Sequence, residues 1–158
     1  MKAAQLLVSC LENEGVHFVF GLPGEENLEL MNALRDSSIR FVLTRHEGAA
    51  AFMADVYGRL TGRAGVCLAT LGPGATNLVT GVADAFLDRA PLVAITAQAN
   101  LSRIHRESHQ YIDILQLFDP ITKWNARVES PEVVPEIVRK AFKLAEAEKP
   151  GSNPHRVA

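Results

Sequence analysis

Short apolar runs alternate with stretches of helical periodicity through the first two thirds of the chain. The apolar runs have the length and composition of buried strands and occupy residues 16–20, 39–43, 65–69 and 91–96. Before and between them, apolar residues recur at three- and four-residue spacing, which predicts helices at residues 3–14, 27–35, 47–60 and 75–87. Strands that are apolar throughout, each followed by a helix, indicate a parallel sheet covered on both faces. The pattern therefore predicts a single α/β domain, a doubly wound parallel sheet with helices on both faces.

The last third of the chain is less regular. It predicts an irregular stretch at residues 103–110, a short helix at 112–118 and a further strand at 122–128. Ser130-Pro131-Glu132 is typical of a helix start, because a hydroxyl can cap the first turn and proline needs no N–H there. The helix that follows should run to about residue 148, with Pro135 early enough to be absorbed as a kink.

Composition narrows the class of protein. With 158 residues the chain is long enough for one domain with a real core, and 47% hydrophobic and 22% charged residues are typical of a globular protein. A net charge of -2 favours neither nucleic acid nor an anionic membrane as a partner, and no apolar run is long enough to cross a bilayer. Cys10 and Cys67 lack a metal-binding spacing and have apolar neighbours, which predicts two buried free thiols and a reducing, cytoplasmic location.

Glu47 is the first candidate for chemistry. It follows the apolar run 39–43 and opens a helix rich in small residues, which places its carboxylate at the carboxyl edge of the predicted parallel sheet. That edge is where open α/β folds bind their ligands. A glutamate in the first turn of a helix also has a purely electrostatic explanation, since it complements the helix dipole. Taken alone, Glu47 is compatible with either role.

A second candidate is the glycine-rich loop Gly72-Pro73-Gly74-Ala75-Thr76-Asn77. It follows a strand and opens a helix, so its N–H groups could face a phosphate. However, Asn77 stands where a dinucleotide fingerprint has its third small residue, and no acidic residue ends the next strand. The alternative is structural: the glycines permit a tight turn between strand and helix.

Several motifs in one register resemble a known family, the thiamine-diphosphate enzymes of the acetolactate synthase type. The motifs are Phe20-Gly21-Leu22-Pro23-Gly24, Arg45-His46-Glu47, Ala54-Asp55-Val56-Tyr57-Gly58-Arg59, Leu71-Gly72-Pro73-Gly74-Ala75-Thr76-Asn77, Ala83-Asp84-Ala85, Gln110-Tyr111-Ile112-Asp113 and Thr122-Lys123-Trp124-Asn125. Each motif is short, but all of them lie in one register and the resemblance extends over residues 3–151, which makes it specific. It identifies residues 1–151 as an amino-terminal pyrimidine-binding domain and leaves residues 152–158 as an atypical polar tail.

The resemblance assigns the catalytic role to Glu47. In the family the matching glutamate hydrogen-bonds N1′ of the cofactor's aminopyrimidine ring and thereby assists removal of the proton from the thiazolium carbon. The activated cofactor then decarboxylates pyruvate and joins the two-carbon unit to a second 2-keto acid. Glu47 must therefore exchange a proton easily near neutral pH, which burial would favour.

Other site residues follow from the same resemblance. The implied cofactor-binding residues, besides Glu47, are Pro73, Asn77, Gly21 and Leu22, and the implied substrate-channel residues are Gln98 and Gln110. Two positions depart from the family pattern: Leu22 replaces a frequent tyrosine, and Gly48 follows the glutamate where relatives carry glutamine. His46 is interpreted as structural, because the family's proton chemistry does not require it.

The resemblance also implies what this chain does not supply. The family's cofactor is thiamine diphosphate with Mg²⁺, and its metal ligands lie on a Gly-Asp-Gly motif in a later domain, whereas this chain contains no Gly-Asp dipeptide. We therefore expect no metal ligands here, no activity from the chain alone, and a homodimer or docking onto a chain that carries the diphosphate-binding domain. A truncated form of the enzyme, a non-catalytic docking remnant, and the first domain of a related decarboxylase or lyase remain alternatives.

Overall fold

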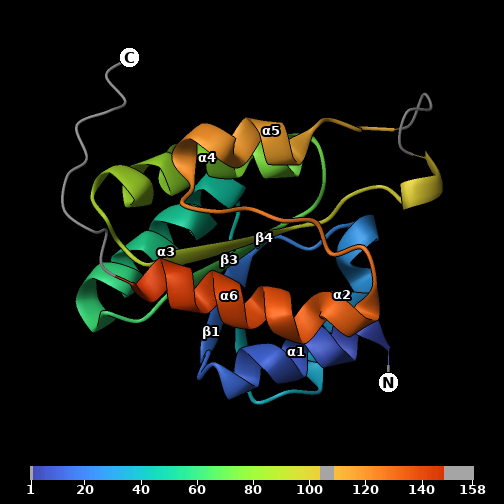
Figure 1. Ribbon diagram of the computed structural model, residues 1–158, viewed down its shortest axis with the longest axis horizontal. Helices are drawn as coiled ribbons and strands as arrows, with labels where there is room; N and C mark the ends of the chain where they lie inside the picture. Colours follow the sequence, from blue (N-terminus) through green and yellow to red (C-terminus); the bar gives the residue numbers. More distant parts are fainter. Residues whose placement is uncertain (1, 104–108, 148–158) are drawn as a thin grey trace.

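The computed structural model describes residues 2–103 and 109–147 (Figure 1). Its centre is a four-stranded parallel sheet in the order β2-β1-β3-β4. The strands are β1 (Phe18–Gly21), β2 (Arg40–Leu43), β3 (Gly65–Ala69) and β4 (Leu92–Thr96). Each matches an apolar run in the sequence to within two residues at its ends.

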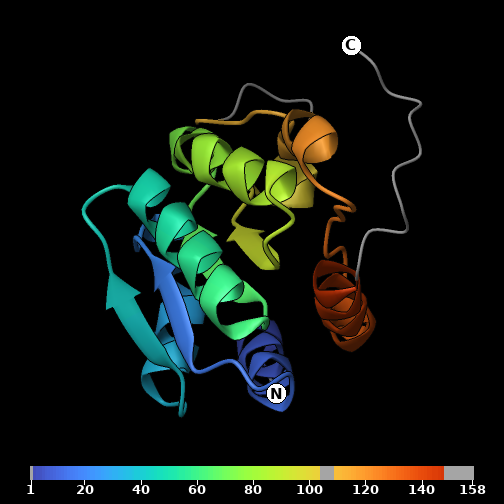
Figure 2. The same ribbon diagram turned by 90° about the vertical axis from the view of Figure 1, so that its left-hand side faces the viewer.

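Helices cover both faces of this sheet, as Figures 1 and 2 show. They are α1 (Ala3–Asn13), α2 (Leu28–Arg35), α3 (Glu47–Thr61), α4 (Pro73–Leu87), α5 (Ile114–Phe118) and α6 (Val134–Glu146), with 3-10 turns at Glu25–Asn27, Leu101–Arg103, Asp119–Ile121 and Pro131–Val133. Helices α1, α2 and α6 share one apolar cluster with the sheet, and α3, α4 and α5 share the other. The predicted doubly wound α/β fold is confirmed.

The central strand β3 shows why the layers separate in this way. Successive side chains of a strand point to opposite faces, so Val66 and Leu68 pack with α1 and α6 while Cys67 and Ala69 pack with α3 and α4. All five residues of β3 are buried. Complete burial also raises the pKa of the Cys67 thiol to about 12, because the charged thiolate is disfavoured in an apolar surrounding.

Helices α3 and α4 approach each other closely because small residues line their contact. A Cβ placed on Gly81 of α4 would lie 2.6 Å from the Cβ of Ala51 and 3.0 Å from the backbone nitrogen of Phe52, both on α3. Ala51 itself is fully buried. The run of small residues in α3 therefore sets the distance between the two helices that flank the loop at residues 70–74.

The predicted strand at residues 122–128 is wrong. Thr122 has extended dihedral angles, but no strand is assigned anywhere in this segment, which connects α5 to α6. Side chains hold it instead: Asn125 Nδ2 donates to the Leu115 carbonyl oxygen at 3.2 Å, and Lys123 Nζ donates to the Leu144 carbonyl oxygen at 2.9 Å. A strand requires a neighbouring backbone in register, and the described residues provide none beside this segment.

The start of the last helix also differs from the expectation. The Ser130 hydroxyl does not cap the backbone. It hydrogen-bonds the Glu132 carboxylate instead, which lowers the pKa of that carboxyl group. Pro135 lies in the first turn of α6, where a missing N–H is tolerated, after the short 3-10 turn that begins at Pro131.

The prediction of two buried free thiols holds for only one of them. Both cysteines are free, but only Cys67 is buried, and Cys10 is half-buried on α1.

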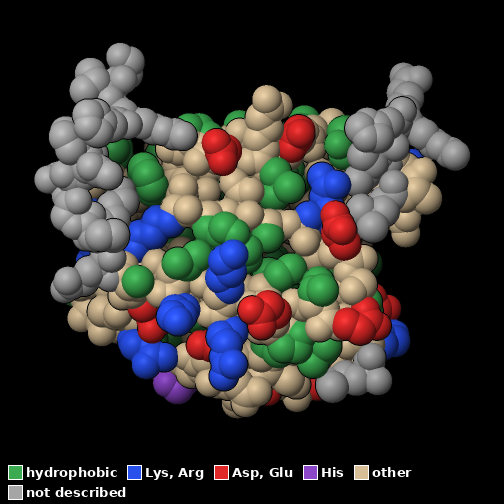
Figure 3. Space-filling model, in the orientation of Figure 1, with side chains coloured by type: hydrophobic (Ala, Val, Ile, Leu, Met, Phe, Trp, Pro, Cys, Tyr) green, Lys and Arg blue, Asp and Glu red, His purple; other side chains and the backbone are tan. Residues whose placement is uncertain are grey.

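Within the two described segments, every helix is too short or too polar to cross a bilayer. Figure 3 shows charged side chains of both signs scattered over one face, with a band of hydrophobic side chains across its middle.

The α3–α4 contact gives the first prediction. Gly81→Val should lower the free energy of unfolding by about 2–3 kcal/mol, because the added carbons meet Ala51 and the α3 backbone. Thr80→Val places the same side chain one position away, on an exposed site of α4. This control should change the free energy of unfolding by less than about 0.5 kcal/mol. Urea unfolding of both variants measures the difference, and equal values would contradict a tight helix contact.

Candidate functional site

The carboxyl ends of the strands meet where the strand order reverses. Strand β1 has β2 on one side and β3 on the other, so the chain leaves β1 and β3 toward opposite sides of the sheet. Open α/β folds bind ligands at such a switch point. The turn after β1 touches both β3 and the loop that follows it: the Leu22 N–H donates to the Leu68 carbonyl oxygen at 3.3 Å, and a Cβ on Gly24 would lie 2.3 Å from Thr70 Cγ2.

Glu47 lies at this edge, as predicted, in the first turn of α3. The preceding residue, His46, caps the helix, because its Nδ1 accepts a hydrogen bond from the Gly48 N–H at 3.0 Å. This geometry agrees with the structural role predicted for His46. It also fixes the first turn of α3, and with it the backbone from which the Glu47 side chain projects.

Asn77 holds the Glu47 carboxylate from the neighbouring helix. Asn77 Nδ2 donates to Glu47 Oε2 at 2.9 Å, and both side chains are half-buried. The other oxygen, Oε1, is directed toward Gly74, where an added Cβ would lie 3.4 Å from it and 2.6 Å from Thr70 Oγ1. Within the described residues Oε1 has no hydrogen-bond partner, so one carboxylate oxygen is fixed and the other remains available to a ligand.

The loop after β3 is a tight turn of the kind that requires glycine. Gly72 has φ of +52°, and Pro73 occupies the first turn of α4, where its missing N–H costs nothing. A Cβ on Gly72 would lie 2.4 Å from the Gln110 carbonyl oxygen. Gln110, itself at φ of +55°, is therefore packed against this turn, although about forty residues separate the two in sequence.

Gly21 and Leu22 lie beside the same edge, in the turn after β1. Asn27 fixes this turn, because its Oδ1 accepts from the Gly24 N–H at 2.9 Å and its Nδ2 donates to the Leu22 carbonyl oxygen at 3.3 Å. Thr44, which is buried, donates from its Oγ1 to the Gly21 carbonyl oxygen at 3.3 Å. The loops after β1 and β2 are thus tied together by side chains.

Sequence reasoning missed three of these residues. Asn27 and Thr44 hold the turn after β1, and Thr70 fills the space between Gly24 and Gly74. The asparagine three residues after Gly24 was a detectable signal, because such side chains commonly bond a nearby N–H at a helix start. Thr44 and Thr70 had no local signal, since their contacts cross between loops.

Gln98 is engaged differently from the rest. Its Nε2 donates to the Ile112 carbonyl oxygen at 2.9 Å, and its Oε1 accepts from the Ala99 N–H at 2.9 Å. Both polar ends of the side chain therefore hold the segment that follows β4. The structure brings Glu47, Asn77, Pro73 and Gln110 around one turn and places Gly21 and Leu22 next to it, whereas Gln98 supports the loop beyond β4.

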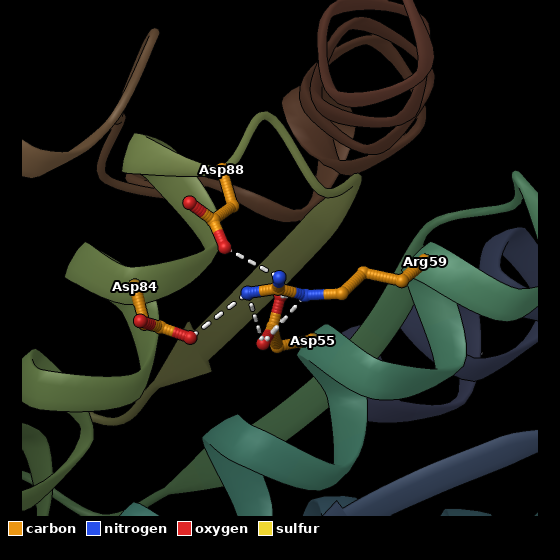
Figure 4. A network of polar contacts seen from close by, with 4 residues as sticks. All are labelled: Asp55, Arg59, Asp84 and Asp88. Carbon is orange, nitrogen blue, oxygen red and sulfur yellow. Dashed lines mark hydrogen bonds and ion pairs between the residues drawn. The ribbon is translucent and has the colours of Figure 1, made fainter.

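An ion-pair cluster holds the other end of the same two helices (Figure 4). Arg59 of α3 donates from Nη2 to Asp55 Oδ2 and to Asp84 Oδ2 of α4, both at 2.9 Å, and from Nη1 to Asp88. Asp55 is only 2% exposed, whereas Asp84 and Asp88 are about half exposed. Hydrogen bonds to Asp55 and Asp88 raise the pKa of the guanidinium further above its ordinary value. The motifs around residues 55–59 and 83–85 therefore form a clamp between α3 and α4.

The described segments contain no cluster of three or more His, Cys, Asp or Glu side chains arranged to hold a metal ion. The chemistry that this edge can perform with its own groups is proton exchange at the Glu47 carboxylate, assisted by the amide of Asn77 and by the positive ends of α3 and α4.

The clamp gives the second prediction. Arg59→Met should lower the midpoint of thermal unfolding more than Asp84→Asn or Asp88→Asn, because only the arginine change leaves the buried Asp55 carboxylate without its partner. Circular dichroism melts of the three variants, at low and high salt, measure the order. Equal effects of Arg59→Met and Asp88→Asn would show that the Asp55 contact adds nothing to stability.

Known proteins resemble this chain in sequence. Residues 1–117 match the family described as "Thiamine pyrophosphate enzyme, N-terminal TPP binding domain". The chain is 48% identical over 151 residues to the probable acetolactate synthase large subunit of Methanocaldococcus jannaschii, covering 96% of this chain and 26% of that protein. It is 48% identical over 151 residues to the chloroplastic acetolactate synthase of Arabidopsis thaliana, and the match covers 95% of this chain and 22% of that protein. It is 45% identical over 151 residues to the acetolactate synthase isozyme 2 large subunit of Escherichia coli, and the match covers 96% of this chain and 28% of that protein.

The chain thus spans about a quarter of the length of the curated relatives that it matches. The match covers the strand ends, the glycine-rich turn and the helices that carry Glu47 and Asn77. On this evidence the chain belongs to the family of N-terminal, TPP-binding domains of thiamine pyrophosphate enzymes.

Proposed function

We propose that this chain is the pyrimidine-binding domain of an acetolactate-synthase-like enzyme, which decarboxylates pyruvate and joins the two-carbon unit to a second 2-keto acid. The observation that carries the proposal is the Glu47–Asn77 pair at the switch point of the sheet, with one carboxylate oxygen open beside Gly74. The names of the relatives support the choice of reaction, since they are acetolactate synthases.

The residues present fit an aminopyrimidine ring. Gly74 leaves a space next to Glu47 Oε1 that any side chain would fill, and a carboxyl group is the partner that a basic ring nitrogen requires. Glu47 would contact the ring nitrogen, and Pro73 and Asn77 would lie along the ring, with Gly21 and Leu22 toward the reacting centre. When bound, the thiamine group supplies the carbanion that adds to the keto carbon of the substrate.

The side chains of this domain hold and move one proton. The amide of Asn77 occupies Glu47 Oε2, so proton exchange with a ligand takes place at Oε1. The His46 cap keeps the first turn of α3 rigid and therefore keeps Oε1 in a constant position. Gln110, packed against Gly72, is suited to line the approach for the substrate, and Gln98 maintains the loop that carries it.

The remainder of the site comes from another domain. A diphosphate group requires a metal ion or several donors, and the Mg²⁺ ligands of the family belong to a later domain. Helix α3, which begins at Glu47, presents Phe52, Met53, Val56 and Leu60 at exposures of 41–81%. This apolar face supports a homodimer, or docking onto a chain that carries the diphosphate-binding domain. The chain alone would then be inactive.

Titration calorimetry tests the incomplete site. Thiamine diphosphate with Mg²⁺ added to the chain should give no saturable heat, because the described residues include no cluster that could hold the metal ion of the diphosphate. Glu47→Gln, measured in parallel, should behave identically. Binding in the micromolar range that Glu47→Gln weakens would show that this domain holds the cofactor unaided.

A chimera tests the reaction itself. Residues 1–147 replace the aligned segment of the Escherichia coli isozyme 2 large subunit, and acetolactate formation from pyruvate is measured. The chimera should be active, and Glu47→Gln in it should reduce kcat by about 10²-fold or more, since the catalytic proton exchange is lost. Thr80→Val is the matched control on an exposed position of α4.

A chimera that binds the cofactor and assembles but forms no acetolactate would contradict the proposed reaction. The chain would then be a docking remnant, if no other 2-keto acid is turned over, or the first domain of a related decarboxylase or lyase, if pyruvate is consumed without carbon–carbon bond formation.

A further inference from the structure

The first turn of α3 depends on one residue, His46. Its carbonyl oxygen accepts from the Ala49 N–H at 3.1 Å and from the Ala50 N–H at 3.4 Å. Its ring Nδ1 accepts from the Gly48 N–H at 3.0 Å. The first N–H groups of a helix lack partners within the helix, so a cap decides how well the first turn is ordered. The main chain and the side chain of His46 together therefore hold the turn that carries Glu47.

Helix α4 touches the same turn at two points. Asn77 Nδ2 donates to Glu47 Oε2 at 2.9 Å, and the Asn77 carbonyl oxygen would lie 3.2 Å from a Cβ on Gly48. The same Cβ would lie 3.0 Å from His46 Nδ1 and 3.3 Å from Cε1 of that ring. Gly48 thus lies between the His46 ring and α4. The cap, the contact with α4 and the Glu47 carboxylate therefore meet within one turn of backbone.

A proton on Nδ1 abolishes this cap. A ring nitrogen accepts a hydrogen bond only through a free lone pair, so the cap requires the neutral ring with its proton on Nε2. Imidazole is the side chain whose charge ordinarily changes between about pH 5 and 8. His46 is exposed, so solvent protons reach its ring. When the pH falls, Nδ1 becomes a donor that faces another donor, the Gly48 N–H. The cap is thus present at the higher pH and lost at the lower pH.

The charged groups around the ring are few. Arg45 and Glu47 adjoin it in the chain, and the positive end of α3 lies beside it. From α4 the facing group is the uncharged Asn77 carbonyl, and α4 carries no charged residue before Asp84. Strands β1, β3 and β4 also pack against α3, and they contain no charged residue. Among these groups it is Glu47 that attracts a protonated ring, and such a pair would occupy the carboxylate that a ligand requires.

We propose that His46 is a positioning residue for the proton exchange at Glu47, and that it acts only in its neutral form. The neutral ring caps α3 and keeps Glu47 in the orientation in which Asn77 binds Oε2 and Oε1 stays open. A solvent proton on Nδ1 releases the Gly48 N–H, loosens the first turn and withdraws the carboxylate from Asn77. This inference rests on the function proposed for Glu47, and it adds a titration separate from that of the carboxyl group.

A purely structural cap would behave differently. Asparagine is as good a cap as any residue, because its side-chain oxygen accepts from the first turn, and it has no group that titrates. His46→Asn therefore keeps the structural role and removes the dependence on protonation. His46→Ala removes both, because alanine offers no acceptor to the Gly48 N–H.

The first test uses amide NMR of the full chain, titrated from about pH 8 to about pH 5. We expect the Gly48 amide and the Asn77 side-chain amide to shift with one common midpoint, that of the His46 ring. The protection of the Gly48 amide against hydrogen exchange should fall about fivefold, which is the size of a typical cap. His46→Asn should abolish this step. His17→Asn, which removes an exposed histidine before β1, should leave the step in place.

The second test uses the chimera with the Escherichia coli isozyme 2 large subunit. The ratio of kcat at about pH 6 to kcat at about pH 8 should be about threefold lower for the parent chimera than for His46→Asn, because only the parent loses its cap. His46→Ala should be slower than the parent at the higher pH and should lack the step. His17→Asn is again the matched control and should keep the ratio of the parent.

Three results would overturn the proposal. The first is a step at the Gly48 amide that persists in His46→Asn, since another group would then cause it. The second is titration of the His46 ring with no response at Gly48 and Asn77, which would leave a structural cap alone. The third is an active chimera whose kcat depends on pH equally in the parent and in His46→Asn.

Failure of the proposed reaction gives a different pattern. A chimera that forms no acetolactate at any pH, from a chain whose Gly48 and Asn77 amides still follow the His46 ring, would contradict the reaction. The same NMR result would support the control of the Glu47 position by His46, because it is measured without substrate or cofactor.

Discussion

The close packing of α3 on α4 is the constraint on which the rest of the structure depends. Both helices start at the carboxyl edge of the sheet, and Gly81 against Ala51 brings them together in the middle. The Arg59 cluster fixes one end of the pair, and the hydrogen bond from Asn77 to Glu47 lies at the other. A carboxylate held by a neighbouring helix can keep one orientation only if the helix spacing is constant, so the packing and the site cannot be separated.

The chemistry proposed for the site depends on an arrangement that leaves one carboxylate oxygen of Glu47 without a hydrogen bond among the described residues. His46 caps the first turn of α3, and Asn77 donates a hydrogen bond to one oxygen of the Glu47 carboxylate. The second oxygen is open beside Gly74. A fully paired carboxylate would stabilise the fold but could not exchange a proton with a ligand. The position of this group at the switch point of the sheet explains why three loops of different origin meet around it.

The two edges of the sheet are unequal. Strand β2 ends the sheet on one side, with Leu43 exposed, whereas β4 faces a cavity that helices and a connecting segment enclose. Natural sheets commonly cover or blunt an unpaired edge. Here helices α4, α5 and α6, together with the connecting segment at residues 122–128, supply that covering.

The sequence by itself determined the fold class and the place of the catalytic candidate. The four apolar runs predicted the strands, because burial on both faces requires continuous apolar residues. The position of Glu47 after one of these runs placed it at the carboxyl edge of the sheet. Only the tertiary structure decided the contacts between distant segments. Asn77 on Glu47, Gln110 against Gly72, Thr70 between two glycines and the Arg59 cluster each join residues from different elements, and no local pattern encodes such a distance. The same reason explains the failure at residues 122–128: strand propensity is a local property, but a strand exists only where a second backbone is present to pair with it.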